Sequence, residues 1–102
     1  MAYKLRFVQK FHKADQELFL KLEKNFIELE RKDSRMPVGR RYLPISAKEP
    51  TNTLIWEAEF PCLEAAIAAL QTIEGNSEHD ALLDQQIGCM IETYTEIYKE
   101  LE

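Results

Sequence analysis

The sequence predicts an α+β fold with one four-stranded antiparallel sheet and helices on one side of it. Its 102 residues are 45% hydrophobic and 30% charged, which is typical of one ordinary globular domain spanning residues 1–102. Short segments of alternating polar and apolar residues predict strands, and segments with apolar residues three and four apart predict helices. In chain order these segments predict the succession β-α-β-β-α-α-β.

The first strand and the first helix have the clearest patterns. Residues 3–11, YKLRFVQKF, alternate with period two and predict a half-buried strand. One face would carry Tyr3, Leu5, Phe7 and Phe11, and the other Lys4, Arg6, Val8 and Lys10. The next segment, KADQELFLKLEKNFIELERK, predicts a helix with Asp15 as its N-cap. Its apolar face consists of Phe19, Leu22, Phe26 and Leu29.

Two further strands are expected in the middle of the chain. Residues Val38 to Ser46 can form a strand, which must lie at a sheet edge because Pro44 has no N–H to donate. Residues Asn52 to Phe60 predict the third strand. One of its faces carries Leu54, Trp56, Ala58 and Phe60.

The second half of the chain predicts two helices and a last strand. The first helix has an apolar stripe from Leu63 to Ile73 and ends at Gly75. The second lies in the segment NSEHDALLDQQIG. Ser77 is its predicted N-cap, Asp80 has the acidic position of a capping box, and Gly88 ends the helix. The last segment, CMIETYTEIYKEL, has two interpretations. A helical period fits Ile87, Ile91, Tyr94, Tyr98 and Leu101, whereas β-branched residues at every second position, Ile91, Thr93, Thr95 and Ile97, favour a strand. We favour the strand.

The predicted order corresponds to a ferredoxin-like fold, in which the first strand is central and flanked by the third and the last. The charges agree with this arrangement. The polar face of the first strand carries Lys4, Arg6 and Lys10, the third strand offers Glu57 and Glu59, and the last offers Glu92 and Glu96. Opposite charges on neighbouring strands stabilise their pairing.

The composition bears on partners, location and metals. Thirteen Lys and Arg against eighteen Asp and Glu give a net charge of −5, which argues against binding to nucleic acid or to an anionic membrane. No segment has the length of a membrane span, and the start of the chain lacks a signal-peptide core, so we expect a cytoplasmic protein. Cys62 and Cys89 form no metal-binding or redox motif, and we expect two free, half-buried thiols and no metal site.

Two stretches resemble a known superfamily. The segment LIWEAEFPCLEAAIAAL, with Trp56 and Glu57 near a strand end before an Ala-rich helix, is similar to a signature of the dimeric α/β barrel superfamily. The closing TEIYKEL resembles the ending of uncharacterised members. The superfamily includes antibiotic-biosynthesis monooxygenases, haem-degrading monooxygenases, stress-responsive barrel proteins and NIPSNAP-like proteins. The resemblance implies a homodimer in which two sheets pack face to face into an α/β barrel.

The haem-degrading members combine an Asn on the first strand, a Trp like Trp56 and a His on the following helix. In this sequence no Asn lies near Phe7 to Gln9, and His79 follows Trp56 at a longer distance than in that pattern. The resemblance therefore argues against haem degradation, and we expect no cofactor.

The candidate site residues each have a structural and a functional interpretation. Trp56 either packs in the core under the helix after Cys62, which we favour, or lines a ligand pocket between sheet and helices. His79 is expected to be exposed at a helix start, and its alternative role is a pocket acid, base or ligand. Arg40 and Arg41 must point to opposite faces of a strand, so at most one of them can bind a shared anion. Tyr94 would lie on a polar, aromatic strand face that is either a cavity or a dimer seam.

We expect a small cytoplasmic homodimer that binds a small metabolite between sheet and helices, with Trp56, His79, Arg40 and Tyr94 as the candidate ligand-binding residues. The alternative is a cofactor-free monooxygenase or isomerase-like enzyme acting on a small aromatic or acidic metabolite. Trp56, His79 and either Arg6 or Arg40 would then be its catalytic candidates. The sequence names no substrate.

Overall fold

The four strands form one antiparallel sheet in the order β2-β3-β1-β4. In the computed structural model, which describes residues 2–102, the central strands are β1 (Tyr3–Phe11) and β3 (Thr53–Phe60). The edge strands are β2 (Arg40–Tyr42) and β4 (Met90–Lys99). The segment that also fitted a helical period is therefore a strand, as its β-branched residues predict.

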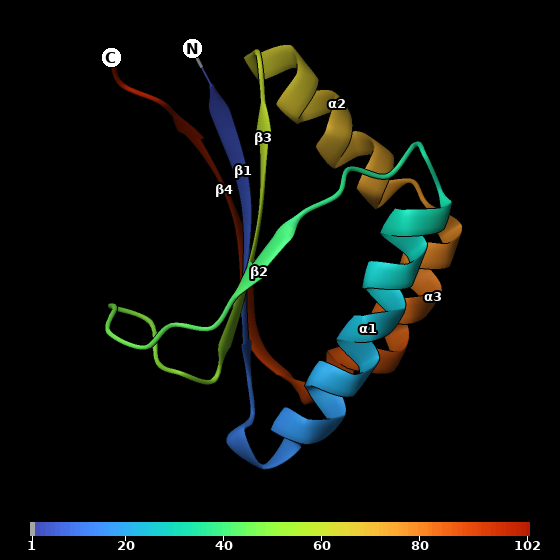
Figure 1. Ribbon diagram of the computed structural model, residues 1–102. Helices are drawn as coiled ribbons and strands as arrows, with labels where there is room; N and C mark the ends of the chain where they lie inside the picture. Colours follow the sequence, from blue (N-terminus) through green and yellow to red (C-terminus); the bar gives the residue numbers. More distant parts are fainter. Residues whose placement is uncertain (1) are drawn as a thin grey trace.

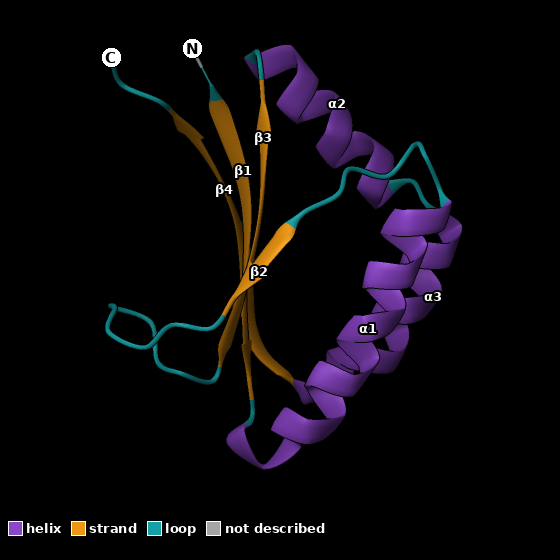
Figure 2. Cartoon of the chain, in the orientation of Figure 1, coloured by secondary structure: helices purple, strands orange, loops and turns teal. Residues whose placement is uncertain are grey.

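Three helices cover one face of the sheet (Figures 1 and 2). They are α1 (Gln16–Lys32), α2 (Leu63–Glu74) and α3 (Ser77–Gln86), and short 3₁₀ turns, η1 (Lys13–Asp15) and η2 (Ile87–Cys89), precede α1 and follow α3. The opposite face, which we call the open face, carries no helix. A loop after β2, residues 43–52, projects from the sheet on this side (Figure 1).

The buried core lies between the sheet and the helices. One cluster contains Leu5, Leu29, Met36, Trp56 and Ile73, and a second contains Phe11, Phe19, Leu54 and Cys89. The expected apolar faces of the first helix and of the third strand both contribute to these clusters. Trp56 is only 4% exposed and stacks on Phe7, with ring centroids 4.9 Å apart, so its predicted place in the core is confirmed.

Several predicted details are corrected. The second strand is three residues long instead of Val38 to Ser46, because Pro44 is buried outside the ladder and the chain turns away into the loop. Asn76, not Ser77, caps α3, since its side-chain oxygen accepts the backbone N–H of His79 at 2.9 Å. The two thiols are not both half-buried: Cys89 is buried and Cys62 is exposed.

The α-helix boundaries are otherwise close to those expected. Asp15 occupies the N-cap position of α1, although its side chain makes no capping hydrogen bond there. Gly75 is the C-cap of α2, as predicted. Gly88 does not close α3 directly, because the helix ends at Gln86 and Gly88 lies within η2.

Charge pairing on the open face follows the prediction in part. Glu57 accepts two cations of β1, with Arg6 Nη2 at 2.5 Å and Lys4 Nζ at 3.6 Å. Lys10 differs, because Glu92 of β4 is its register partner but its Nζ forms an ion pair with Glu49 in the loop, at 3.5 Å. This ion pair holds the loop on the sheet. The sequence pattern instead predicts that Lys10 pairs with an acidic residue of a neighbouring strand.

At Gly39, just before β2, the backbone lies against the indole ring of Trp56. A Cβ atom at Gly39 would lie 2.0 Å from the indole Cε2 and Nε1 atoms of Trp56. The backbone N–H of Gly39 also donates to Glu30 Oε1 at 3.0 Å, which fixes this approach. Only a residue without a side chain fits between β2 and the indole.

We predict that Gly39→Ala lowers the free energy of unfolding by about 1–3 kcal/mol, because the added methyl group must displace Trp56 or the backbone. Gly88→Ala is the matched control, since nothing lies within 4 Å of its added Cβ and no glycine among residues 2–102 has a positive φ. Urea unfolding followed by Trp56 fluorescence measures both variants. Equal stability of Gly39→Ala and Gly88→Ala would contradict the close packing.

Candidate functional site

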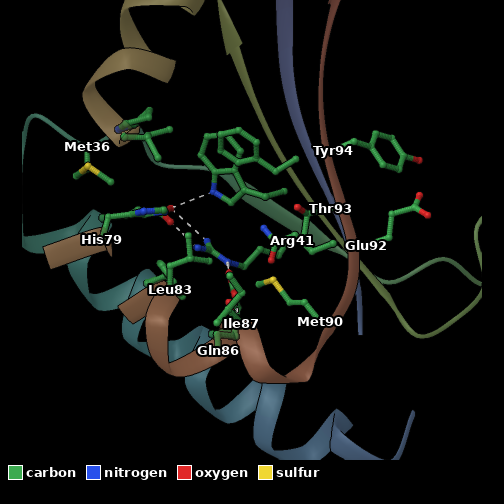
Figure 3. Close-up of a pocket in the computed structure, with 18 of the residues that line it drawn as sticks. Met36, Arg41, His79, Leu83, Gln86, Ile87, Met90, Glu92, Thr93 and Tyr94 are labelled. Atoms are coloured by element: carbon green, nitrogen blue, oxygen red, sulfur yellow. Dashed lines mark hydrogen bonds and ion pairs between the residues drawn. The ribbon is translucent and has the colours of Figure 1, made fainter. Parts of the chain in front are cut away.

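A cavity of about 370 Å³ lies between the sheet and the helices α1 and α3 (Figure 3). Its wall is mostly apolar, with one edge of the Phe7–Trp56 stack on the sheet side. The other apolar lining residues are Phe26, Met36, Pro37, Ile73, Leu83, Ile87, Met90 and Ile91. This volume and this lining are typical of sites for small organic ligands.

A buried ionic cluster forms the floor of the cavity. Arg41 points from β2 to the helix face of the sheet, where its Nε donates to Glu23 Oε2 at 2.6 Å. The other end of its guanidinium binds Glu30, with Nη1 at 3.2 Å from Oε1 and Nη2 on Oε2. Both carboxylates come from α1, so one arginine ties this helix to the edge strand.

Neutral groups complete this cluster. Trp56 Nε1 donates to Glu30 Oε1 at 3.4 Å (Figure 3). Gln86 of α3 donates through Nε2 to Glu23 Oε1 at 2.9 Å and to the carbonyl oxygen of Phe19 at 3.2 Å. Each carboxylate is therefore held by the arginine and by at least one neutral donor, as buried charges require.

Burial and ion pairing change the ionisation of this cluster. Desolvation raises the pKa of Glu23 above its usual value, although Gln86 and Arg41 act in the opposite direction. Desolvation also lowers the pKa of Arg41, but the hydrogen bonds to Glu30 and Glu23 outweigh it and the net shift is upward. The guanidinium thus stays charged and is fully engaged by two acids.

His79 lines the cavity from the first turn of α3. Its ring contacts Phe26 edge-on, with centroids 5.0 Å apart, and its buried Nδ1 atom has no hydrogen-bond partner in the described part of the chain. Desolvation lowers the pKa of His79 below 6.5, so the ring is neutral at neutral pH. A neutral imidazole with one free nitrogen can accept a hydrogen bond or a proton.

The side-chain oxygen of Gln9, on β1, is a second buried acceptor without a partner. It lies on the helix face of the sheet, and Thr93 of β4 pairs with Gln9 in the ladder. Gln9 and His79 thus each combine a side chain that lines the cavity with a buried polar atom that has no partner among residues 2–102. The cavity offers no free cation, because Arg41 is its only Lys or Arg lining residue within residues 2–102 and is already paired.

The structure brings only some of the predicted site residues together. Trp56 and His79 both line the cavity, and the expected exposure of His79 is wrong because α3 packs on α1 through Phe26. Tyr94 belongs to the lining at its edge, but its ring points away from the cavity (Figure 3) and its hydroxyl donates to Glu49 at 3.0 Å. Desolvation and this bond raise the pKa of Tyr94 to about 12.

Arg6 and Arg40 lie outside the cavity. Both pair with Glu57 in the strand register, and Arg6 forms an ion pair with Glu57 on the open face. Of the adjacent arginines, Arg41 is the one that faces the helices. An acidic ligand in the cavity would therefore find no unpaired arginine.

Sequence reasoning missed Glu23 and Glu30. The sequence pattern does indicate that these two acids are buried. They lie seven residues apart, on the same side of the helix as the apolar residues Phe19, Phe26 and Leu29. Charged residues on the buried stripe of a helix need a partner, and Arg41 was one of the two adjacent candidates.

The described residues contain no metal-ligand cluster and no helix able to span a membrane. No group of three or more His, Cys, Asp or Glu in residues 2–102 could hold a metal ion. None of the helices in the same range is long and apolar enough to cross a bilayer.

Comparison with solved structures gives the fold. A NIPSNAP family protein from Agrobacterium tumefaciens is 8% identical and has a TM-score of 0.76, over 100% of this chain and 95% of that chain. An antibiotic biosynthesis monooxygenase is 10% identical, with a TM-score of 0.71 over 98% of this chain and 99% of that one. A dimeric protein of unknown function and ferredoxin-like fold from Bacteroides fragilis is 18% identical, with a TM-score of 0.63 over 97% and 96% of the two chains.

The chain has a ferredoxin-like fold. The predicted fold and the predicted resemblance are thus confirmed at the level of the fold. No family model matches the sequence, and no curated protein matches it. At these identities the similarity carries no information on the activity of this chain.

The lowered pKa of His79 predicts a pH dependence of stability. As the pH falls through about 6.5, the unfolded chain binds more protons at this ring than the folded chain does, so the free energy of unfolding decreases between about pH 7 and pH 5. In His79→Gln this part of the decrease should be absent. Urea unfolding at several pH values measures it.

His12→Gln is the control for this prediction, because His12 is exposed and lies outside the cavity. This variant should keep the wild-type pH dependence. A wild-type dependence in His79→Gln would contradict the buried, neutral state of His79.

Proposed function

We propose that the protein binds a small, flat, uncharged metabolite in the cavity between sheet and helices. The observation that carries this proposal is His79, which lines the same cavity as Trp56 and whose buried Nδ1 has no hydrogen-bond partner among residues 2–102. Buried polar atoms without partners are uncommon in folded proteins, and a ligand that donates a hydrogen bond would satisfy this one. An aromatic ring with a hydroxyl group would meet both requirements, because its ring suits the apolar part of the wall and its hydroxyl group can donate a hydrogen bond to His79.

The electrostatics of the cavity narrow the ligand class further. Arg41 is bound by Glu23 and Glu30, so an added carboxylate would meet two acids and no free cation. A phenol or an enol avoids this repulsion and can stack on the exposed edge of the aromatic pair. We therefore prefer a hydroxylated aromatic ligand to an acidic one.

A second candidate is a cofactor-free oxygenase or isomerase-like enzyme, and the same His79 favours it. A neutral imidazole held in an apolar wall is a suitable general base for a phenolic or enolic proton. Trp56 would position the ring of the substrate, and His79 would take its proton. The structural neighbour described as a monooxygenase lends this candidate an analogy, at the level of the fold alone.

We further propose that the protein is a cytoplasmic homodimer assembled through the open face. No helix covers the open face (Figure 1), and one structural neighbour is described as dimeric. An exposed free thiol at Cys62 and an absence of disulfides among the described residues are compatible with a reducing compartment. The net charge of −5 supports a protein that does not bind nucleic acid or anionic membranes.

Calorimetric titration with 2-naphthol and with its matched carboxylate, 2-naphthoate, tests the ligand class. We expect 2-naphthol to bind at least roughly tenfold more tightly, because the carboxylate must approach Glu23 and Glu30 without a free partner. Binding of 2-naphthol as its phenolate, seen by absorbance, would support the enzyme candidate. Stronger binding of 2-naphthoate would contradict the proposed class.

The variant His79→Leu locates the bound ring. Removing the acceptor should weaken 2-naphthol binding by roughly threefold to tenfold, the value of one hydrogen bond. His12→Leu, at an exposed position outside the cavity, should bind like the wild type. Equal binding by both variants would place the ligand elsewhere.

A further inference from the structure

The wall of the cavity is buried on one side and exposed on the other. Within residues 2–102, the lining residues that α1 and β3 contribute are all buried, and they are Glu23, Phe26, Glu30 and Trp56. The exposed lining residues all belong to η2 and β4, and they are Ile87, Ile91, Glu92 and Thr93. The cavity therefore opens where η2 continues into β4.

Two isoleucines form an apolar rim at this opening. Ile87 is 57% exposed and Ile91 is 52% exposed, and both line the cavity. The side chains of Glu92 and Tyr94 extend to the other side of β4 (Figure 3), so they leave the rim apolar. Exposed apolar side chains that gather at a cavity are typical of a surface that binds a ligand.

A β-bulge explains why Ile91 reaches this rim. Lys10 pairs with Glu92, but the next residue of β1, Phe11, pairs with Met90, so within residues 2–102 Ile91 has no partner in this ladder. Consecutive side chains in a regular strand point to opposite faces. Here Met90 packs against the core cluster of Phe11, and Ile91 lines the cavity as well. Bulges re-aim side chains in this way and are frequent next to active sites.

The rim lies at the end of the cavity opposite His79. Figure 3 shows His79 on one side of the cavity and Met90 on the other. His79 belongs to the first turn of α3, and Ile87 directly follows the last residue of this helix. The helical rise between the two positions is about 12 Å. A single hydroxylated ring at His79 is too short to reach the rim.

The size of the cavity agrees with a longer ligand. Its volume of about 370 Å³ falls in the range of sites for ligands that are larger than one aromatic ring. A ring beside Trp56 leaves the part of the cavity between η2 and β4 free. The residues around this part are apolar, and they are Leu83, Ile87, Met90 and Ile91.

We infer that the ligand is a hydroxylated aromatic compound with an apolar chain, and that Ile87 and Ile91 bind this chain where it leaves the cavity. The inference rests on the proposed function and deepens it, because it adds the substituent that the rim selects. The hydroxyl group lies at the His79 end, and the chain lies between η2 and β4. An apolar chain gains free energy when it leaves water for this rim, whereas a charged substituent does not.

Calorimetric titration with 4-methylphenol, 4-ethylphenol, 4-butylphenol and 4-hexylphenol tests the rim. We expect the affinity to rise about twofold to threefold per added methylene group, because each group is partly buried. In Ile87→Asn and in Ile91→Asn the rise per methylene group should fall below about 1.5-fold, since a polar amide replaces the apolar contact. Ile67→Asn is the matched control. Ile67 is 41% exposed on α2 and does not line the cavity, so this variant should keep the wild-type rise.

Methyl NMR locates the chain independently of these variants. With ¹³C-labelled isoleucine methyl groups, the terminal methyl group of bound 4-hexylphenol should give nuclear Overhauser effects to Ile87 and Ile91. Ile67 and Ile45, which are exposed outside the cavity, should give none. Contacts to Ile67 or Ile45 without contacts to the rim would overturn the inference.

The remaining outcomes separate this inference from the proposed function. Binding of 2-naphthol without a rise along the alkylphenol series would refute the chain and leave the proposed function in place. No binding of 2-naphthol or of any alkylphenol would refute both. An equal rise in the wild type, Ile87→Asn and Ile91→Asn would show non-specific partitioning and also refute the chain.

Sedimentation equilibrium distinguishes a rim that binds a ligand from one that contacts a second copy. Weaker self-association of Ile91→Asn, together with an unchanged rise per methylene group, would assign the rim to the contact between copies and contradict the inference. Thermal melting followed by circular dichroism verifies that each variant is folded.

Discussion

The arrangement of the helix face depends on one buried guanidinium. Arg41 links the short edge strand β2 to the middle of α1, where it forms ion pairs with Glu23 and Glu30. Gln86 extends the same cluster to α3, and Trp56 and Gly39 donate to Glu30. Such a cluster adds little net stability because three charges lose their hydration, but removing one member leaves the others buried without a partner.

The two faces of the sheet have different proposed roles: the helix face forms the ligand cavity, and the open face forms the contact with a second copy. On the helix face, Trp56 is both a core residue and part of the cavity wall, so the two interpretations of its role do not exclude each other. On the open face, Glu57 pairs with Arg6 and Lys4, and the 43–52 loop is held over the sheet by the bonds of Glu49 to Lys10 and Tyr94.

The fold could be predicted from the sequence because strands and helices leave periodic patterns. The alternation in residues 3–11 and 52–60 determined which side chains face the helices, and β-branched residues at every second position identified β4. The site was less predictable for a physical reason. Whether Arg40 or Arg41 faces inward depends on the register of β2, a strand of three residues whose length the pattern overestimated. The burial of His79 depends on the packing of α3 against Phe26, a long-range contact that no local pattern contains.

The claim that Arg41 positions the cavity wall is tested most directly by the indole N–H resonance of Trp56 in the variant Arg41→Met. The chain has one tryptophan, so its ¹H–¹⁵N spectrum contains a single indole signal. Without the guanidinium, Glu23 and Glu30 repel each other and Glu30 loses its fixed position. We expect the indole signal to shift and to exchange with solvent faster, while the backbone signals of β1 remain in place. An indole signal with wild-type position and exchange in a folded Arg41→Met protein would contradict the central role of this residue.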